Sequence, residues 1–383
     1  MVYSRFSRLL VVVFGLAPLS LAAFQEVSND QCNCFLTNGS RADFFTTHKF
    51  FDYREKTKYA SVPSLIDDPD DSSDAGPVND YFYSKEWADS WSIQNWTNVG
   101  SFPSNVSDAT ALMVNSRNNV YFEKNNDENA DSSTFLTMRT ARLDNFQTAS
   151  EFESTIENYH YLSVRMYART IGAPGAITAI FTYKEIANNS DLATVQESDL
   201  EIRTIDPSNR IQYTNQPSYS AMGPDVQETT KNVTIPQERD WTNWAVYRMD
   251  WSPEATTWYI NGDEVASISF QTPRDPSLLV LNAWSDGGSW SGNMSVGEAA
   301  YLQIQWIDIV YNITDSSDSN DTTDSQNSKR DEQSCINICS IDETDKIGTQ
   351  VLLTGGASSI LGNMGSYAGI ISWVCVLSMV TTF

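Results

Sequence analysis

Short apolar runs separated by polar turns recur along most of the chain, and long stretches with the apolar repeat of an amphipathic helix are absent from it. Between two of these runs stands Asn261-Gly262, a dipeptide typical of the two-residue turn of a β-hairpin. Many short strands without helices form a sandwich or jelly roll, so we expect an all-β fold. The strands are expected at residues 119–122, 135–138, 161–168, 176–183, 197–204, 244–251, 257–260, 264–270, 278–284 and 301–311.

The expected strand at residues 197–204 begins with three acids on alternate positions, Glu197, Asp199 and Glu201. Because strand side chains alternate between two faces, we expect all three carboxyls on one face. Carboxyls so placed raise one another's pKa, which a fold tolerates more readily where the acids have a function. Cleavage of a glycosidic bond suits them, since it needs one carboxylate as nucleophile and one carboxylic acid as proton donor. The alternative is a solvated strand edge that carries three acids.

The separation of the two glutamates sets a further condition. A retaining enzyme holds its two carboxyls about 5–5.5 Å apart, whereas four residues of flat strand span roughly 13 Å. Glu197 and Glu201 must therefore lean together on a curved sheet. The shorter Asp199 fits between them as the partner that orients and tunes one of them.

Composition narrows the classes of function. The net charge of −25 argues against binding to nucleic acid or to an anionic membrane surface, but it leaves a neutral polysaccharide open. The two histidines, His48 and His160, are far apart in sequence, which disfavours a histidine-ligated metal and Ser-His-Asp catalysis. The chain also lacks a Walker loop and a GxGxxG motif. We therefore expect no cofactor and no metal at the site.

Both ends of the chain have the features of targeting segments. Residues 1–23 fit a secretory signal peptide, with Arg5 and Arg8 before an apolar core and cleavage after Ala22 or one residue later. Near the other end, small residues, a spacer and an apolar tail make a GPI-attachment signal. We expect attachment at Gly356 and removal of residues 357–383. A single-pass anchor is the alternative, although the apolar tail is short and has no basic flank.

Between these segments we expect a domain at residues 24–312, a Ser- and Asp-rich linker at 313–334 and a cysteine-containing tail at 335–356. Secretion favours disulfides, and four cysteines remain once Cys375 of the apolar tail is set aside. Four cysteines allow three connectivities, and we favour two bonds that join the early pair to the late pair. These cysteines are Cys32, Cys34, Cys335 and Cys339. Glycosylation sequons begin at Asn38, Asn95, Asn105, Asn188, Asn232, Asn293, Asn312 and Asn320.

The segment Glu197-Ser198-Asp199-Leu200-Glu201 is similar to the Glu-x-Asp-x-Glu signature of glycoside hydrolase family 16. The segment at 167–181 resembles the strand pair before that signature, and segments at 244–262, 279–288 and 307–311 resemble later parts of that family in the same order, so the resemblance covers about residues 120–312. It implies a concanavalin A-like β-jelly roll of two curved antiparallel sheets with a glycan cleft. It also implies Glu197 as nucleophile, Asp199 as its helper and Glu201 as acid/base. Ser198 replaces the usual aliphatic residue, and we expect it to face away from the cleft and to pack more weakly.

Candidate sugar contacts lie in two places. Tyr213, Asn215 and Gln216 carry uncharged hydrogen-bonding groups suited to sugar hydroxyls, although a polar turn explains them equally well. Trp284 lies near glycines and is expected to stack on sugar rings in the cleft, whereas the placement of Trp290 is left open. We expect two other tryptophans in the core, Trp251 and Trp258.

The resemblance together with the anchor signal implies a monomeric surface enzyme of a fungal cell wall that acts on β-glucan. Hydrolysis and transglycosylation share a covalent intermediate, so the sequence leaves both open. A rival interpretation is an inactive lectin-like wall protein, because the same sandwich carries lectins. The intact acidic triple, Glu197, Asp199 and Glu201, favours the enzyme. A structural wall mannoprotein, the third interpretation, predicts more Ser/Thr repeats.

Overall fold

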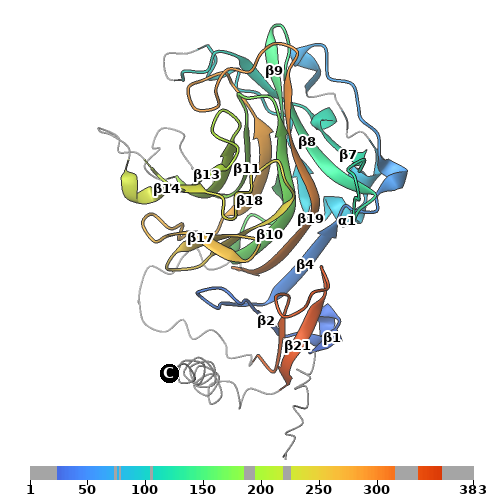
Figure 1. The fold of residues 1–383 in the computed structure, drawn as a ribbon, viewed down its shortest axis with the longest axis vertical. Helices are drawn as coiled ribbons and strands as arrows, with labels where there is room; N and C mark the ends of the chain where they lie inside the picture. Colours follow the sequence, from blue (N-terminus) through green and yellow to red (C-terminus); the bar gives the residue numbers. More distant parts are fainter. Residues whose placement is uncertain are drawn as a thin grey trace, which may run out of the picture.

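The computed structural model describes residues 24–72, 76, 79–103, 107–184, 195–218, 226–314 and 335–355. The signal peptide, the GPI tail with Gly356, Cys375 and most of the linker lie outside these ranges, as do Asn105, Asn188 and Asn320. The described chain forms a large β-sandwich with a small sheet beneath it (Figure 1). No helix within those ranges has both the length and the apolarity that a membrane span requires.

One layer of the sandwich, the cleft sheet, carries the acidic strand near its middle. Its order is β14-β13-β12-β11-β18-β9, with β5 paired on the far side of β9. All these pairs are antiparallel. The strands are β14 (Thr230–Thr234), β13 (Arg210–Gln216), β12 (Gln196–Arg203), β11 (Ile177–Lys184), β18 (Leu278–Trp284), β9 (Phe146–Ser154) and β5 (Trp91–Ile93).

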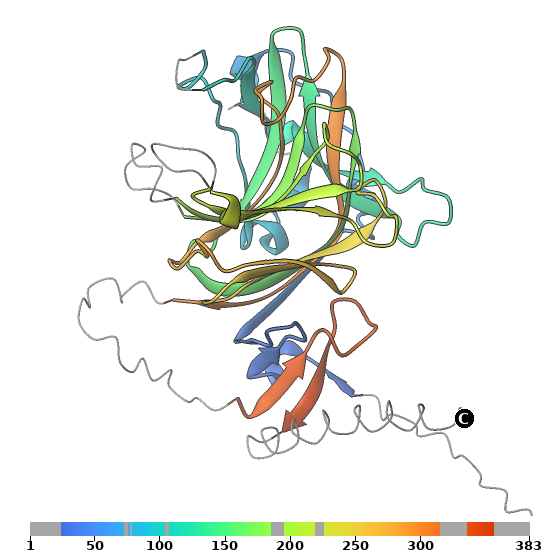
Figure 2. The same ribbon diagram turned by 60° about the vertical axis from the view of Figure 1, so that its left-hand side comes forward.

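The second layer, the outer sheet, has the order β8-β19-β10-β15-β16-β17, with β4 paired to β19 and β7 to β8. The two layers pack face to face (Figure 2). Strand β9 joins them, because its first half pairs with β8 and β6 and its second half pairs with β18. The strands are β8 (Thr134–Arg142), β19 (Ala299–Ile313), β10 (Tyr159–Gly172), β15 (Ala245–Trp251), β16 (Thr256–Ile260), β17 (Asp263–Ile268), β4 (Thr47–Asp52), β7 (Val120–Lys124) and β6 (Leu112–Asn115).

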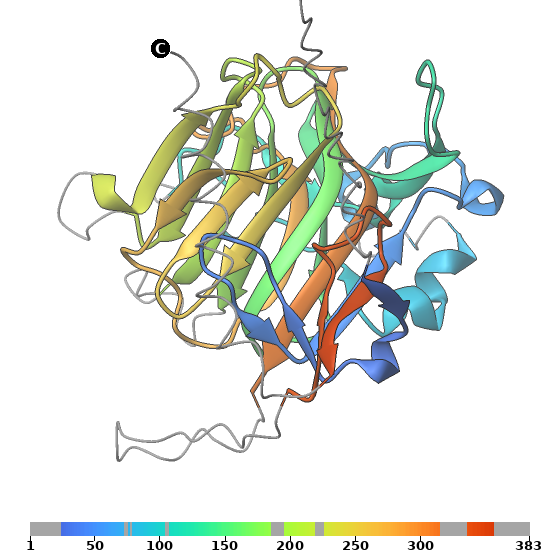
Figure 3. The same cartoon turned by 60° about the horizontal axis from the view of Figure 1, so that its bottom comes forward.

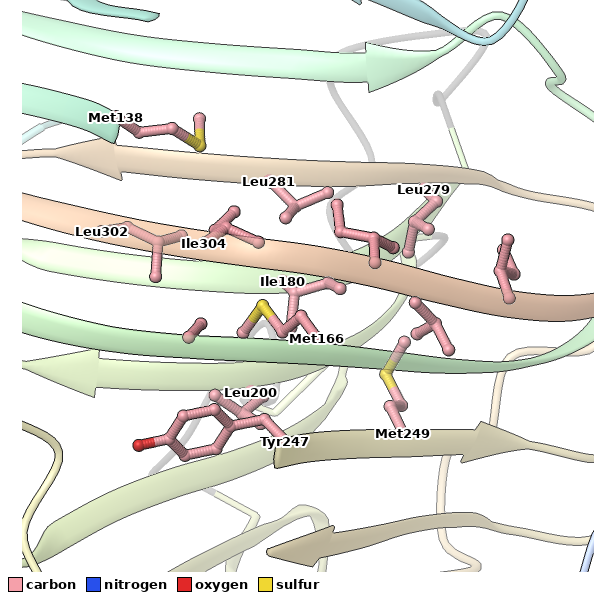
Figure 4. Close-up of a cluster of buried hydrophobic side chains, with 14 of the residues drawn as sticks. Met138, Met166, Ile180, Leu200, Tyr247, Met249, Leu279, Leu281, Leu302 and Ile304 are labelled. Atoms are coloured by element: carbon pink, nitrogen blue, oxygen red, sulfur yellow. The ribbon is translucent and has the colours of Figure 1, made fainter. Parts of the chain in front are cut away.

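Alternation along the strands builds the core between the layers. Leu200 of β12 and Ile180 of β11 point to one side and pack against apolar side chains of the outer sheet, such as Met166 and Met249 (Figure 4). Burial of each such side chain contributes about 1.5–3 kcal/mol, so this inner face fixes the register of each strand. A one-residue slip of β12 would bury its acids and expose Leu200. The register of the core thus decides where the acids lie.

The expected fold class is confirmed, and each of the ten expected strands overlaps an observed one. The expected strands do not include β4, β5, β6, β9, β13 and β14 of the two layers. In β9, Phe146–Ser154, eight of nine residues are buried and several are small or polar, so its two faces differ little in the sequence. An alternating apolar pattern appears only where one face is buried and the other meets solvent.

The small sheet joins the two ends of the described chain. Its order is β1-β21-β20-β2-β3, so strands before residue 46 pair with strands after residue 336. The expected bonding between the early and late cysteines is confirmed, as Cys32–Cys339 and Cys34–Cys335. The strands are β1 (Gln25–Val27), β21 (Gln350–Gly355), β20 (Asn337–Ser340), β2 (Cys34–Leu36) and β3 (Phe44–Phe45).

The small sheet docks on the outer face of the outer sheet (Figure 3). The carboxylate of Asp342, which follows β20, accepts hydrogen bonds from the Nη2 of Arg165 at 2.7 and 2.9 Å. Arg248 of β15 donates to Asn38 at 2.8 Å, and Asp342 lies 3.7 Å from the same guanidinium. Buried charge pairs therefore hold the small sheet to the sandwich, on the side away from the core.

Among the described sequons, Asn38, Asn232 and Asn293 are exposed, whereas Asn95 and Asn312 are partly buried. The amide of Asn312 is engaged at both atoms, because its Oδ1 accepts from the backbone of Thr46 and its Nδ2 donates to Phe44 O. Glycosylation at these positions stays a prediction, and Asn312 is the poorest acceptor among them.

Candidate active site

A cavity of about 440 Å³ lies on the face of the cleft sheet that points away from the core. Side chains of β12, β11, β18 and β9 line it, with Asn115 of β6 and Trp96 at its rim. Five carboxyl groups line this cleft, and no Lys, Arg or His stands among the described residues that do so. The carboxyls belong to Glu151, Glu153, Glu197, Asp199 and Glu201.

The acidic strand β12 has the alternation that the sequence predicts. Glu197, Asp199 and Glu201 line the cleft, whereas Ser198 and Leu200 are buried on the opposite face. Ser198 faces away from the cleft, but it does more than pack weakly. Its hydroxyl donates to Asn215 Oδ1 at 2.6 Å and lies 2.8 Å from the hydroxyl of Thr256. Hydrogen bonds thus satisfy this polar residue inside the core.

Glu197 and Asp199 form a coupled pair. Burial and the charges of Glu197 and Glu201 hold the pKa of Asp199 well above its usual range. Burial raises the pKa of Glu197 to about 6, and the neighbouring carboxyl of Asp199 limits that rise. The shared proton therefore resides on Asp199, and Glu197 is the carboxylate of the pair. An ionised carboxylate is the form that can attack an electrophilic carbon.

Glu201, the third acid of the strand, has a pKa raised to near neutrality. Burial and the charge of Glu197 raise its pKa to about 7, against the effect of a hydrogen bond from Trp290. The indole Nε1 of Trp290 donates to Oε1 of Glu201 at 3.2 Å. A carboxyl with a pKa near 7 can donate a proton and later accept one at neutral pH.

Glu151 and Glu153 of β9 complete the acidic lining, and the sequence analysis missed both. The indole of Trp96 donates to Glu151 at 2.6 Å, and Gln94 donates to Glu153 at 3.0 Å. Burial raises the pKa of Glu151 to about 7. The signal that could have found them is their spacing, since they stand two residues apart like the acids of β12.

Two of the predicted sugar contacts are wrong. In the register of β13 against β12, Tyr213 stands opposite Leu200 and Asn215 opposite Ser198, so both point into the core. Tyr213 packs there against Trp258, and Asn215 donates to the backbone of Ile268 and Phe270. Period-two alternation assigns the cleft face of β13 to the residues opposite the acids, Gln212, Thr214 and Gln216.

The other residues predicted to contact sugar, and the tryptophans predicted for the core, lie where the sequence places them. Gln216 stands opposite Glu197 in the ladder, and its side chain limits the rise in the pKa of Asp199. Trp284 lines the cleft from the end of β18. Trp290, which the sequence left open, is 37% exposed and reaches Glu201. Trp251 and Trp258 are fully buried, which confirms their assignment to the core.

The cleft also presents an acceptor to a ligand. Asn282 of β18 is 8% exposed, lines the cleft, and has no partner for its Oδ1 among the described residues. A sugar hydroxyl that donates to this atom would satisfy it. In the described ranges, no three His, Cys, Asp or Glu side chains are grouped so that they could hold a metal ion.

Part of the chain is similar to known proteins. The model of the family described as "Glycosyl hydrolases family 16" matches residues 113–308. A beta-glucanase of Paenibacillus polymyxa is 23% identical over 175 residues, or 45% of this chain and 68% of that protein. A beta-glucanase of Bacillus licheniformis is 21% identical, and the match covers 40% of this chain and 59% of that protein. The structure of an endo-beta-1,3-glucanase from Pyrococcus furiosus, 15% identical, covers 59% of this chain and 90% of its own with a TM-score of 0.46.

Proposed function

The chain belongs to glycosyl hydrolase family 16, and from this premise we propose that it cleaves or transfers cell-wall β-glucan with retention of configuration. The observation that carries the proposal is the set of three carboxyls on the cleft face of β12, Glu197, Asp199 and Glu201. Each has a raised pKa, and each lines the same cavity of about 440 Å³.

The first step assigns a different role to each acid. Glu201 donates its proton to the glycosidic oxygen while the carboxylate of Glu197 attacks the anomeric carbon. The bond to the leaving sugar breaks, and a covalent glycosyl-enzyme forms on Glu197. Asp199 holds its proton against Glu197 in the resting state and so orients the nucleophile. Burial of the cleft wall supplies the raised pKa that keeps Glu201 protonated near neutral pH.

The second step reverses the proton transfer. Glu201, now a carboxylate, takes a proton from a water molecule or from a sugar hydroxyl as that oxygen attacks the anomeric carbon. Water gives hydrolysis, and a sugar hydroxyl gives a lengthened glucan chain. Incubation with labelled β-glucans of different linkage, with and without oligosaccharide acceptors, followed by product sizing, separates these outcomes. Retained binding without any product would instead favour the lectin-like alternative.

The roles of the two glutamates are tested by azide rescue. In Glu201→Ala, an aryl glycoside that needs no proton should still glycosylate Glu197, and the intermediate should persist because the base is missing. Azide needs no base, so it should restore turnover and give a glycosyl azide of retained configuration. Glu197→Ala should give the inverted azide product. The opposite pair of configurations would exchange the two roles.

We also propose that the protein is secreted and held at the outer membrane leaflet by a GPI anchor, as a monomer in a fungal wall. Two disulfides between distant cysteines suit an oxidising compartment and support secretion. Release of the protein from intact cells by a GPI-specific phospholipase tests the anchor. Detection of a C-terminal peptide ending at Phe383 in the mature protein would exclude it.

A further inference from the structure

The acid Glu201 has a neutral hydrogen-bond donor beside it, and that donor comes from a loop rather than from the sheet. Trp290 lies in the connection between β18 and β19, and its Nε1 donates to Glu201 Oε1 at 3.2 Å. Both residues are partly exposed at the cleft, and Trp290 is 37% exposed. The bond therefore reaches an acid that lines the cavity.

Several hydrogen bonds hold the loop that carries Trp290 in place. The backbone oxygen of Asp286 accepts from the amides of Thr110 and Ala111 at 2.9 and 2.8 Å. The Thr110 hydroxyl donates to Gly287 O at 2.9 Å, and the amide of Ser289 donates to Asp108 at 2.9 Å. These bonds join the loop to the segment before β6, so the indole is presented from a fixed support.

Arg203 fixes the ring itself. It stands two residues after Glu201 on β12, and its guanidinium lies over the Trp290 ring, 4.3 Å from the centroid. Its Nε donates to the backbone oxygen of Trp290 at 3.1 Å. Stacking on the face of the ring leaves the indole N–H at its edge free to reach Glu201. The strand that carries the acid thus also holds the donor to it.

We propose that Trp290 is a positioning residue that places the catalytic proton on the Oε2 atom of Glu201 and steadies the carboxylate left after proton donation. An indole N–H can only donate. The carbonyl oxygen of a carboxylic acid is a better acceptor than its hydroxyl oxygen, so the atom bonded to Trp290 is the carbonyl and the proton sits on the other oxygen. When the proton leaves, the bond becomes charge-assisted and strengthens.

This inference rests on the proposed role of Glu201, and it predicts a dependence on the leaving group. Proton donation limits the rate when a sugar departs, because a sugar alkoxide is a poor leaving group. It matters little when an activated aryl group departs. Loss of the indole N–H should therefore slow cleavage of glucan much more than cleavage of an aryl glycoside.

The test variant is Trp290→Phe, which keeps an aromatic ring for Arg203 but removes the N–H. We expect kcat/KM on a β-glucan oligosaccharide to fall roughly 10–100-fold, the equivalent of one hydrogen bond to a charged group. The activated aryl glycoside should lose less than about threefold by the same argument. The alkaline limb of the pH profile should move to higher pH, because the bond favours the ionised form and lowers the pKa of Glu201.

Trp96→Phe is the matched control, since it removes an indole donor to Glu151 in the same cleft but not to the acid/base. It should affect both substrates alike and leave the alkaline limb in place. Arg203→Leu frees the ring and also removes a positive charge that lowers the pKa of Glu201, so it should show the leaving-group dependence of Trp290→Phe and move the alkaline limb in the same direction. This second variant also tests the inference if Trp290→Phe does not fold.

Equal losses on both substrates with a raised KM would overturn the inference and make Trp290 a platform for sugar stacking. An unchanged pH profile together with unchanged rates would overturn it as well. A wild-type protein that cleaves neither substrate would instead overturn the proposed function, so the two failures are distinguishable.

Discussion

Two regions of the molecule bury several charged groups, and they do so in opposite ways. In the cleft, Glu197, Asp199, Glu201 and Glu151 lie among other carboxyls. Beneath the outer sheet, the docking cluster pairs every carboxylate with a cation or an imidazole at 2.7 Å. The docking cluster consists of the Arg165–Asp342, Arg248–Asp250 and His48–Asp308 pairs.

The two regions differ in how they offset the free-energy cost of burying a charged group. A buried charge is tolerated when it is paired and hydrogen-bonded, and the docking cluster meets that condition. The cleft meets that condition largely by protonation instead, since the pKa of Asp199 is held well above its usual range and burial raises the pKa of Glu201 and of Glu151 to about 7. Paired charges hold elements together, whereas unpaired carboxyls remain able to exchange protons. The same residue types thus serve structure in one region and chemistry in the other.

The largest expected effect is in the cleft. Glu197→Gln should lower activity on glucan by roughly 10⁴-fold or more, because the nucleophile is lost while the shape of the cleft is kept. The free energy of unfolding should not decrease, since one of several mutually repelling carboxyls is removed. Initial rates and urea unfolding measure the two quantities. A marked loss of stability would show that the cleft acids hold the fold, and the contrast between the regions would fail.

The docking cluster should respond in the opposite way. Asp342→Asn leaves Arg165 buried without its carboxylate, so the free energy of unfolding should fall by about 3–5 kcal/mol. Activity per folded molecule should stay as in the wild type, because the cluster lies on the far side of the sandwich from the cleft. Lys85→Ala, which removes an exposed i,i+4 pair with Asp89, is the control and should cost less than about 0.5 kcal/mol.

Part of this contrast was predictable from the sequence. The period-two spacing placed Glu197, Asp199 and Glu201 on one face, and Leu200 and Ile202 on the other face fixed which face is buried. In β13 the same rule places Tyr213 in the core, opposite Leu200, and the hydroxyl of Tyr213 alone does not reveal this. The pairing of Arg165 with Asp342 joins residues 177 positions apart, and local periodicity carries no information about such a contact. Burial on both faces hid β9 and with it Glu151.

The two disulfides also join the N- and C-terminal segments of the small sheet, which the docking cluster holds to the sandwich. Reduction of Cys32–Cys339 and Cys34–Cys335 should lower the free energy of unfolding by about 2–5 kcal/mol. The charge pairs remain, so the reduced protein should keep its activity at low temperature. Activity and urea unfolding before and after reduction and alkylation measure both. Loss of activity while the sandwich stays folded would show that the small sheet supports the cleft.

The stability of the protein should depend on pH through the cleft acids and not through the docking cluster. Asp199 has a raised pKa in the folded state. Its contribution to the free energy of unfolding is therefore fully present below its unfolded pKa, and it is lost as the pH rises through the folded pKa. The same sign holds for Glu201, over a window from about 4 to about 7. The free energy of unfolding should therefore decline across that window, and Asp199→Asn should flatten the decline. A similar flattening in Asp342→Asn would contradict the assignment of the slope to the cleft.

The smallest effect is expected at Ser198, which lies on the acidic strand but faces the core. Its hydroxyl donates to Asn215 Oδ1, and that amide in turn donates to the backbone of Ile268 and Phe270, at the end of β17 and just beyond it. Ser198→Ala leaves Asn215 Oδ1 without its donor inside the core, which should cost about 1–2 kcal/mol. Kinetic constants on glucan and on an aryl glycoside should not change, since the alternation of β12 directs Ser198 away from Glu197 and Glu201. Thr256→Val removes the neighbouring hydroxyl but leaves the Ser198–Asn215 bond, so it should cost less. A changed kcat in Ser198→Ala at unchanged stability would show that the core face of β12 is coupled to the chemistry on its other face. Structural and reactive polar groups would then not be separated along this strand.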